Sequence, residues 1–366
     1  MLKPTYRLPE LPPPIDLETV PILKALAAAN RALAELKGRA ATIPNQSILI
    51  DTLALQEAKA SSEIENIVTT QDELFQVDIF PEGPGSSAAK EVALYREALR
   101  LGYDRLVTSG RILSNNTLIE MFRLLKRRDD GFRTTPGTAL KNDRTGVIVY
   151  VPPQDADEII ALMTALERFM NDDAACKLDP LIKMALLHHQ FESIHPFADG
   201  NGRIGRILNV LYLTRTGLLD TPILYLSRHI TRTKDDYYRL LQAVRDDGVW
   251  EEWIVYMLEA VAVTARTTLQ LVEGVREQMA RAKHRMRTEL PKIYSQDLLN
   301  NLFRHPYTRI EFVASDLDVT RQTAAKYLET LTASGFVHKH QNGPSNYYIN
   351  VELVRLFMEI ADDKRD

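Results

Sequence analysis

The sequence predicts a mainly α-helical protein that carries one isolated β-hairpin and a small C-terminal module. Apolar residues recur at helical spacing along most of the 366 residues, strand signals are sparse, and the pattern changes after residue 291. Helices are expected at residues 17–36, 48–66, 88–106, 114–128, 155–171, 178–192, 202–216, 232–246 and 250–284. Proline and glycine predict a linker at residues 81–87, and Pro291 closes the last of these helices.

The composition indicates two or three packed domains and argues against several classes of function. The chain is 45% apolar and 26% charged, and its net charge of −4 gives no global attraction to nucleic acid or to anionic membranes. The single cysteine, Cys176, excludes an internal disulfide framework and fits the reducing cytoplasm. No apolar run approaches the roughly 20 residues that span a bilayer. The N-terminus lacks a secretory pattern, so a cytoplasmic location without membrane contact is expected.

Residues 195–206 gather several chemically distinct groups in one short stretch. His195 is a base that is neutral near pH 7, and Asp199 is a hard oxygen ligand suited to a magnesium ion that phosphates hold. Gly200 and Gly202 let backbone N–H groups approach an anion closely, and Asn201 between them adds a side-chain donor. This combination is what a site needs if it binds a polyphosphate and deprotonates a nucleophile.

The glycine loop is expected to lead into a helix, because apolar residues at helical spacing follow it. The free N–H groups and the dipole of a helix N-terminus favour phosphate. Arg203 and Arg206 lie three positions apart on one face of the first turn, and each offers a rigid fork of donors. Each residue taken alone also fits a loop with a core histidine and solvated charges, but the whole set favours an anion site.

The stretch resembles the signature of the Fic family, His-Pro-Phe-x-(Asp/Glu)-Gly-Asn-Gly-Arg-x-x-Arg, with every specified position matched. Residues 190–194 are similar to the helix that leads into that signature. The resemblance implies a Fic-type helical core whose activity is the transfer of AMP from ATP to a Tyr, Thr or Ser hydroxyl of a target protein or of itself, with release of pyrophosphate. The phosphotransferase branch of the family carries Lys where this chain has Gly202, which favours AMP transfer.

The resemblance also implies a role for each matched position. His195 would be the general base for the target hydroxyl, and Asp199 would hold the Mg²⁺ that bridges the phosphates of ATP. The anion cradle would consist of Gly200, Asn201 and Gly202, with Arg203 and Arg206 on the β- and γ-phosphates. Such roles agree with the physics of phosphoryl and nucleotidyl transfer, which relies on positioning and charge neutralisation.

A second motif lies upstream, within the helix expected at residues 48–66. Ser61 and Glu65 are four residues apart, so they face the same way, and the stretch resembles the inhibitory motif of the family, (Ser/Thr)-x-x-x-Glu-(Gly/Asn). The resemblance implies that Glu65 pairs with Arg206 and so keeps ATP from binding productively. By spacing alone, Glu65 is also one acid among several on a solvated helix. A further alternative is that Glu65 positions a water that removes AMP, which would make the protein bifunctional.

Residues 131–153 read as a hairpin, because a β-branched run at 147–151 is bounded by Gly and Pro. One edge of an isolated hairpin can add a strand from another chain. In Fic proteins a hairpin at this position, the flap, docks the target protein in that way. The alternative is a structural hairpin that covers the core. Further along, Tyr237 or Tyr238 would stack on the adenine by resemblance, although tyrosines at helical spacing also serve as packing residues.

Residues 292–366 resemble a winged helix-turn-helix module, with three helices followed by a hairpin at 336–350. The third helix, at 319–328, is expected to be capped by Thr320. DNA contacts through residues 319–350 would come from Arg321, Gln322, Thr323 and Lys326 on that helix and from His338, Lys339 and His340 on the wing. Acids roughly balance bases across the module, so DNA binding is not favoured over a protein contact or a homodimer surface.

Together these patterns predict three segments. Residues 1–87 form an N-terminal arm and the helical region with the inhibitory motif, residues 88–287 form the Fic catalytic core, and residues 288–366 form the winged-helix module. One alternative function is a DNA-binding regulator whose core senses nucleotide. Another is a zinc hydrolase that uses His188, His189 and His195, but adjacent histidines on a helix point about 100° apart and rarely bind one ion.

Overall fold

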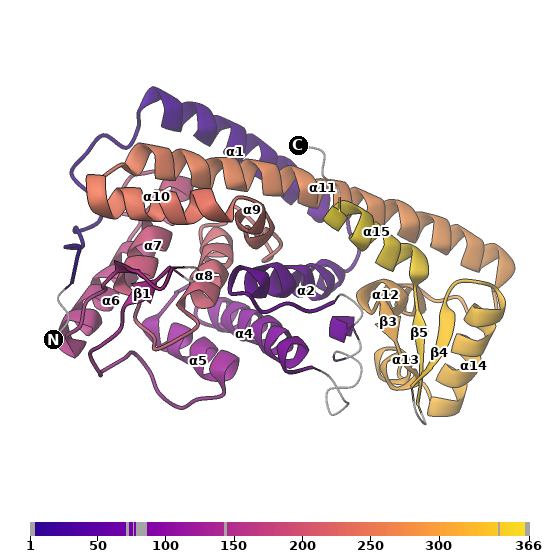
Figure 1. The fold of residues 1–366 in the computed structure, drawn as a ribbon. Helices are drawn as coiled ribbons and strands as arrows, with labels where there is room; N and C mark the ends of the chain where they lie inside the picture. The colour runs from indigo at the N-terminus through magenta and orange to yellow at the C-terminus, as the bar shows by residue number, and fades with distance from the viewer. Residues whose placement is uncertain are drawn as a thin grey trace. The chain divides into compact units, whose positions relative to one another are not determined.

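The computed structural model describes residues 4–70, 73–75, 77, 86–142, 145–342 and 345–362 (Figure 1). The chain divides into two compact units, each built from separate stretches. The first unit comprises Met1–Ala34, Glu57–Val68 and Leu94–Ala265, and the second comprises Glu35–Gln56, Thr69–Ala93 and Arg266–Asp366. The three segments expected from the sequence stay a prediction.

The first unit is helical and holds one hairpin. Its helices are α5 (Asn115–Lys126), α6 (Ala156–Asn171), α7 (Pro180–Ile194), α8 (Asn201–Arg215), α9 (Ser227–Arg232) and α10 (Lys234–Asp247). Four longer helices have one part in each unit, namely α1 (Val20–Ala40), α2 (Ser47–Ile64), α4 (Ser87–Thr108) and α11 (Trp250–Glu289). Strands β1 (Leu140–Lys141) and β2 (Ile148–Tyr150) pair antiparallel, with Leu140 opposite Tyr150.

Helices α7 and α8 form the centre of the first unit. Helix α7 packs against α6 and α8, and α5 packs against α6 and α8 (Figure 1). Almost every side chain of α7 and α8 is buried, including polar ones such as His188, Glu192 and Arg206. The start of α7 is defined locally, because the side chain of Asp179 accepts the N–H of Leu181 and Pro180 occupies the first turn.

The second unit contains the C-terminal module. Its elements are α12 (Gln296–Arg304), β3 (Tyr307–Thr308), α13 (Ile310–Leu317), α14 (Arg321–Ala333), β4 (His338–Asn342), β5 (Ser345–Ile349) and α15 (Val351–Asp362). The three strands form an antiparallel sheet in the order β3-β5-β4, with both Tyr307 and His338 opposite Ile349. Thr320 caps α14 by accepting the N–H of Thr323, which confirms the expected cap.

Most expected helices are present within a few residues of their predicted bounds, and the exceptions are short or terminal elements. The sequence pattern does not predict α9, β3 or α15. The 147–151 strand is confirmed but shorter, since β2 ends at Tyr150, before the prolines that follow Val151. Residues 81–85 of the expected linker lie outside the described residues.

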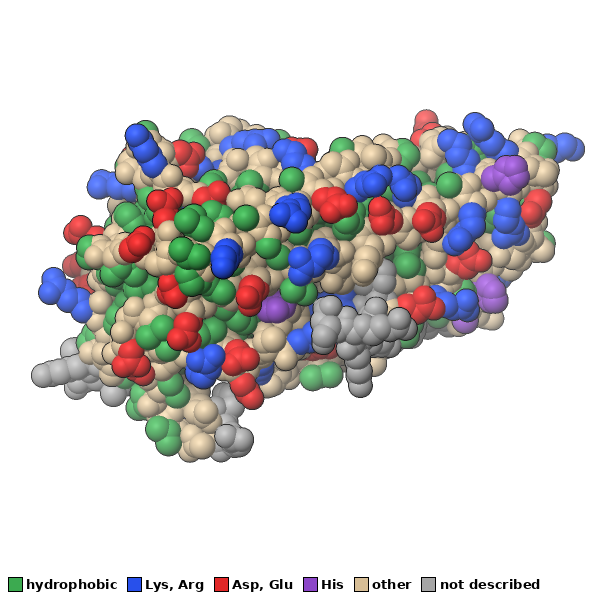
Figure 2. Space-filling view, turned by 90° about the horizontal axis from the view of Figure 1, so that it is seen from above, with side chains coloured by type: hydrophobic (Ala, Val, Ile, Leu, Met, Phe, Trp, Pro, Cys, Tyr) green, Lys and Arg blue, Asp and Glu red, His purple; other side chains and the backbone are tan. Residues whose placement is uncertain are grey.

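Charged side chains of both signs are interspersed over the face of the molecule in Figure 2, in keeping with the small net charge of −4.

Within the described residues, no helix has both the length and the apolar character that crossing a membrane requires.

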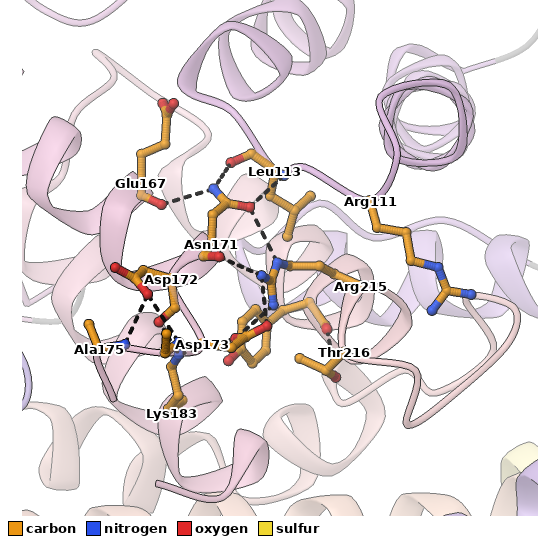
Figure 3. Close-up of polar contacts among 12 residues, drawn as sticks. Arg111, Leu113, Glu167, Asn171, Asp172, Asp173, Ala175, Lys183, Arg215 and Thr216 are labelled. Atoms are coloured by element: carbon orange, nitrogen blue, oxygen red, sulfur yellow. Dashed lines mark hydrogen bonds and ion pairs between the residues drawn. The ribbon is translucent and has the colours of Figure 1, made fainter. Parts of the chain in front are cut away.

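A partly exposed polar cluster ties the far end of α8 to its neighbours (Figure 3). The guanidinium of Arg215 donates to both carboxylate oxygens of Asp173 at 3.0 Å and to the carbonyl of Asn171 at 2.8 Å. The amide of Asn171 in turn donates to the carbonyl of Leu113 at 2.7 Å, and Lys183 of α7 lies 3.5 Å from Asp173. These contacts hold the ends of α6 and α8 together, so the opposite end of α8 is presented by a rigid scaffold.

Trp253 offers a test of this core, since it is fully buried and its indole N–H donates to the carbonyl of Ala185 on α7 at 2.9 Å. We expect Trp253→Ala to lower the free energy of unfolding by about 3–5 kcal/mol. Trp253→Phe, which mainly removes the donor, should cost about 1–3 kcal/mol. Urea denaturation followed by circular dichroism measures both. Ile160→Ala, at an exposed position, is the control, and equal midpoints for all three variants would contradict the packing described.

Candidate functional site

The site is built around the junction of α7 and α8. Helix α7 ends at Ile194, and His195 is its C-cap in the left-handed conformation, with φ 50° and ψ 59°. Its N–H donates to the carbonyl of Phe191 at 3.0 Å. Gly200, with φ 75°, precedes α8 in the same left-handed region. The two positive φ angles turn the chain sharply between the helices, and glycine adopts that conformation without cost.

Asn201 closes the loop between the two helices. Its side-chain oxygen accepts the N–H of Phe197 and its side-chain nitrogen donates to the carbonyl of the same residue, both at 2.8 Å. Gly200 provides no side-chain cap, so the first N–H groups of α8 have no capping oxygen from that residue. The start of α8 therefore has the geometry and the dipole that bind an anion.

Arg206 is the buried cation of this site. Its Nε donates to the hydroxyl of Ser61 at 2.8 Å, and its terminal nitrogen donates to the carbonyl of Ser61 and to Oε1 of Glu65, each at 2.9 Å. Although burial acts to lower the pKa of Arg206, the charge of Glu65 raises it above its ordinary value. Ser61 and Glu65, which the sequence predicts on one helix face, both contact Arg206, the arginine that the resemblance assigns to Glu65.

Gly202 makes the approach of Glu65 geometrically feasible. A Cβ atom at this position would lie 2.4 Å from Oε1 of Glu65 and 2.9 Å from a terminal nitrogen of Arg206. Any larger side chain would displace the ion pair. The glycine is therefore needed for space, because it sits in an ordinary helical turn and not at a positive φ.

His195 is held neutral by its surroundings. Burial, followed by the positive charges of Arg133 and Arg245, lowers its pKa to about 4, while Glu65 opposes this shift. The imidazole is therefore unprotonated at pH 7 and able to accept a proton. Neither arginine stands out in the sequence, because each lies far from the signature and only the fold brings it to the base.

Asp199 lies at the edge of the site with its side chain 59% exposed. Lys126 of α5 contacts its carboxylate at 2.7 Å, and the N–H of Gly200 donates to it at 2.6 Å. Partial burial acts to raise the pKa of Asp199, but the hydrogen bond and charge of Lys126 lower it overall. An ionised, accessible carboxylate beside the start of α8 suits a magnesium ion shared with phosphates. Arg203, on the first turn of α8, is buried beside the same loop.

Two buried acids near the site were not predicted. Glu192 of α7 lies against Gly205, and its Oε1 has no hydrogen-bond partner among the described residues. Burial raises its pKa to about 7, against the charge of Arg206. Glu57 of α2 accepts from the hydroxyl of Tyr95 at 2.9 Å and from the hydroxyl of Ser227. Its spacing of four and eight residues from Ser61 and Glu65 is the signal that could have revealed it.

The two tyrosines that were candidates for the adenine site differ in position. Tyr237 is buried, and its hydroxyl pairs with Nε2 of His188 at 2.8 Å, whereas Tyr238 is largely exposed. Tyr237 also packs on Trp253, at 5.8 Å between ring centroids, which fits the alternative of a packing residue. The adenine role of either tyrosine stays a prediction.

The histidines of the hydrolase alternative do not converge. Nε2 of His188 meets Tyr237, and Nε2 of His189 meets the carbonyl of Leu241 at 3.3 Å. In the described ranges, no three His, Cys, Asp or Glu side chains are grouped as metal ligands. The zinc hydrolase therefore has no ligand set in this part of the chain.

Two of the basic side chains expected to face DNA in the C-terminal module have acidic partners. Arg321 lies 2.9 Å from Glu311, and Lys339 lies 2.6 Å from Glu329. These pairs reduce the positive charge available to a phosphate backbone, which needs a basic face. The winged-helix assignment itself stays a prediction.

Three family models match the chain. The model described as Fic/DOC family N-terminal matches residues 23–104, and the Fic/DOC family model matches residues 112–213. The model described as protein adenylyltransferase SoFic-like, C-terminal domain, matches residues 278–353. Ser61 and Glu65 lie in the first range, and the α7–α8 junction lies in the second.

Curated relatives match shorter stretches. The chain is 30% identical over 113 residues to the protein adenylyltransferase Fic of Drosophila yakuba, which covers 31% of this chain and 21% of that protein. It is 29% identical over 164 residues to the protein adenylyltransferase Fic of Culex quinquefasciatus, which covers 44% of this chain and 31% of that protein. The chain thus spans about a fifth to a third of the length of these relatives.

Solved structures share the fold. A Fic family protein from Desulfovibrio desulfuricans G20 superposes with a TM-score of 0.55 at 20% identity, over 95% of this chain and 98% of that one. Fic-1 from C. elegans superposes with a TM-score of 0.54 at 20% identity, over 70% of this chain and 75% of that one. The expected mainly helical, Fic-type fold is confirmed.

Asn201 provides a test of the loop that does not depend on function. Asn201→Asp keeps the size of the side chain but replaces the donor to the carbonyl of Phe197 with an oxygen, so the loop should open. We expect a loss of about 1–3 kcal/mol in unfolding free energy, with faster amide exchange at Phe197. Urea denaturation measures the unfolding free energy, and hydrogen exchange with mass spectrometry measures the exchange at Phe197. Asn116→Asp, at an exposed position in α5, is the control, and equal exchange in both variants would refute the loop closure.

Proposed function

Because this chain belongs to the Fic/DOC family, we propose that it is a protein adenylyltransferase that moves AMP from ATP to a hydroxyl side chain of a protein and is held inactive by Glu65. The observation that carries the proposal is the buried pairing of Arg206 with Ser61 and Glu65 at the start of α8. A buried guanidinium beside free helix N–H groups suits a phosphate. An acid that pairs with this guanidinium competes with a phosphate for the same donors.

In the proposed reaction, the triphosphate lies along the start of α8. Arg203 and Arg206 neutralise the β- and γ-phosphates, and the N–H groups after Gly200 contact phosphate oxygens. His195, neutral at pH 7, accepts the proton of the target hydroxyl. The hydroxyl oxygen then bonds to the α-phosphorus, the bond from this phosphorus to the bridging oxygen breaks, and pyrophosphate leaves. Asp199 would hold a magnesium ion, which supplies further charge neutralisation when bound.

Inhibition follows from charge competition. The carboxylate of Glu65 lies 2.9 Å from the terminal nitrogen of Arg206. While it stays there, the guanidinium cannot face a γ-phosphate, and the like charges of carboxylate and triphosphate repel each other. The side chain of Glu65 is 34% exposed, so it can leave the pair without unfolding α2. The same exposure supports the alternative that Glu65 directs a water to a modified residue.

Glu65→Gly tests the inhibitory role. With ATP and magnesium, the variant should add AMP to itself or to target protein at least about tenfold faster than wild type, because Arg206 becomes available. Intact-mass spectrometry reads the gain of AMP. Glu63→Gly is the matched control, since Glu63 occupies the same turn but pairs with Lys59. In the double variant Glu65→Gly/His195→Ala the gain should disappear.

The outcomes separate the two roles of Glu65. Equal labelling of wild type and Glu65→Gly would refute inhibition. Protein modified by the Glu65→Gly variant, then purified and incubated with wild type, should keep its AMP if Glu65 only inhibits. Loss of AMP in that incubation would instead establish the bifunctional alternative. Parallel reactions with GTP and UTP test whether ATP is the preferred nucleotide donor.

The β1–β2 hairpin is the proposed docking site for the target. The side chains of Val147, Ile148 and Val149 are 63%, 44% and 43% exposed. Main-chain groups of Val151, which directly follows β2, pair with Thr5 at 3.1 Å. The ladder shifts register here, with Leu140 opposite Tyr150 and Lys141 opposite Ile148, so Val149 is the extra residue of a bulge and lies outside the paired positions. This supports strand addition beside Val149, while the buried Tyr150 and Val151 anchor the hairpin as a structural element.

Val149→Pro removes the main-chain N–H of the bulge residue, beside which we propose that the target strand docks. In the Glu65→Gly background, we expect transfer of labelled AMP to proteins of a cell lysate to fall by about tenfold, because a docked strand loses a main-chain bond. Affinity for ATP, measured by calorimetry, should not change. Val149→Thr keeps the N–H and is the control. Equal lysate labelling by the two variants would exclude docking at this edge.

A further inference from the structure

Arg133 is a buried cation that no part of the proposed reaction uses. It lies between α5 and β1, and its side chain is almost fully inaccessible. Its guanidinium donates to main-chain carbonyl groups: Nε to His195 at 2.8 Å, and one terminal nitrogen to Ile194 at 3.3 Å and to Pro153. Within the described ranges, no carboxylate contacts this guanidinium. Burial of a charge against carbonyls alone costs free energy, which indicates that Arg133 has a specific role.

The carbonyls of Ile194 and His195 belong to the end of α7. The last carbonyls of a helix lack partners within the helix and form the negative end of its dipole. Arg133 supplies those partners, and its own main-chain N–H donates to the carbonyl of Pro196 at 2.8 Å. One residue therefore contacts three consecutive carbonyl groups, at 194, 195 and 196.

The contact with His195 bears on the orientation of the base. His195 has a φ of 50°, a conformation that residues other than glycine adopt at a cost. The direction of its carbonyl depends on the same backbone angles that direct its imidazole. A fixed donor on that carbonyl therefore selects the backbone conformation from which the imidazole projects.

The same guanidinium reaches the hairpin. Pro153 follows β2 by three residues, and its carbonyl shares a terminal nitrogen of Arg133 with Ile194. A second link runs beside it, since the hydroxyl of Tyr150 donates to the carbonyl of Ser193 at 2.7 Å. The end of the hairpin and the end of α7 are thus joined through side chains that meet directly beside the base.

We propose that Arg133 is a positioning residue for His195, which it holds in the reactive backbone conformation while it joins the base to the β1–β2 hairpin. The inference rests on the proposed AMP transfer and adds to it a route by which a strand docked on the hairpin aligns the base. It has an electrostatic part as well. Arg133 and Arg245 are the positive groups that face His195 and keep it neutral, Glu65 is the opposing acid, and the main chain of Glu192 accepts a hydrogen bond from the ring.

Two variants separate the geometry from the charge. Arg133→Lys keeps the charge but loses the rigid fork, and Arg133→Gln loses both. In the Glu65→Gly background, we expect both to lower kcat by about 100-fold, the cost of a slightly misplaced base. KM for ATP should stay within about twofold, since neither variant touches the phosphate cradle. Arg128→Gln, at an exposed position in the same segment, is the control and should keep the parent kcat.

A readout that needs no nucleotide tests the charge. Diethyl pyrocarbonate reacts with neutral imidazole, so the pH dependence of modification at His195, followed by peptide mass spectrometry, reports its protonation. In the parent and in Arg133→Lys, modification of His195 should be as fast at pH 5 as at pH 7, because the imidazole stays neutral at both values. In Arg133→Gln the midpoint should move up toward 6.5, the ordinary histidine value. A merely structural arginine would leave that midpoint in place.

The results decide each part separately. Parent-like kcat in either Arg133 variant would overturn the positioning role, and an unmoved midpoint in Arg133→Gln would overturn the electrostatic role. If Arg133→Gln unfolds, as circular dichroism would reveal, Arg133→Lys still decides the positioning role by its kcat, and Arg133→Met replaces it in the titration. If the Glu65→Gly parent itself transfers no AMP, the proposed function fails, while the titration still judges Arg133 on its own.

Discussion

The buried guanidinium of Arg206 is the constraint on which the arrangement of the site depends. A cation removed from water must meet an anion or a set of oxygen acceptors, because the cost of leaving it unpaired is several kcal/mol. In this structure the partners are Ser61 and Glu65. Gly202 leaves the space for the carboxylate, and the last turn of α2 and the residue just after it supply Ser61 and Glu65. In the proposed reaction a phosphate takes over that role, so inhibitor and substrate exclude each other by charge and by space.

The second constraint is how α2 is held in place. Glu57 lies two turns before Glu65 and is buried with the hydroxyls of Tyr95 and Ser227 around its carboxyl group. Burial raises its pKa to about 7, while its hydrogen bonds act in the opposite direction. The end of α2 that leads to Glu65 is therefore anchored to α4 and α9 within the first unit. Glu65 can leave Arg206 by side-chain rotation, because the backbone that carries it is fixed elsewhere.

The third constraint is the end of α7. Two left-handed residues, His195 and Gly200, bracket a loop that Asn201 closes from within, while Arg133 and Tyr150 satisfy the helix carbonyls from outside. The main-chain carbonyls from Ser193 to Pro196 all accept a hydrogen bond from Arg133 or Tyr150. A base held in this way needs little reorganisation when a substrate arrives, which is how a site with no covalent chemistry of its own gains its rate.

The sequence alone determined the helical class, the anion loop and the pairing of Ser61 and Glu65 on one face, because helical spacing, turn chemistry and a contiguous signature are local properties of a chain. It also predicted which arginine the acid would meet, since the resemblance assigns that partner. Only the tertiary structure decided the surroundings of the base. Arg133, Arg245 and Lys126 come from distant elements, and no local pattern marks them. Burial lowers the pKa of His195 to about 4, together with the charges of two arginines, and raises the pKa of Glu192 to about 7. Such desolvation is a property of the packed interior, which no local stretch of sequence displays.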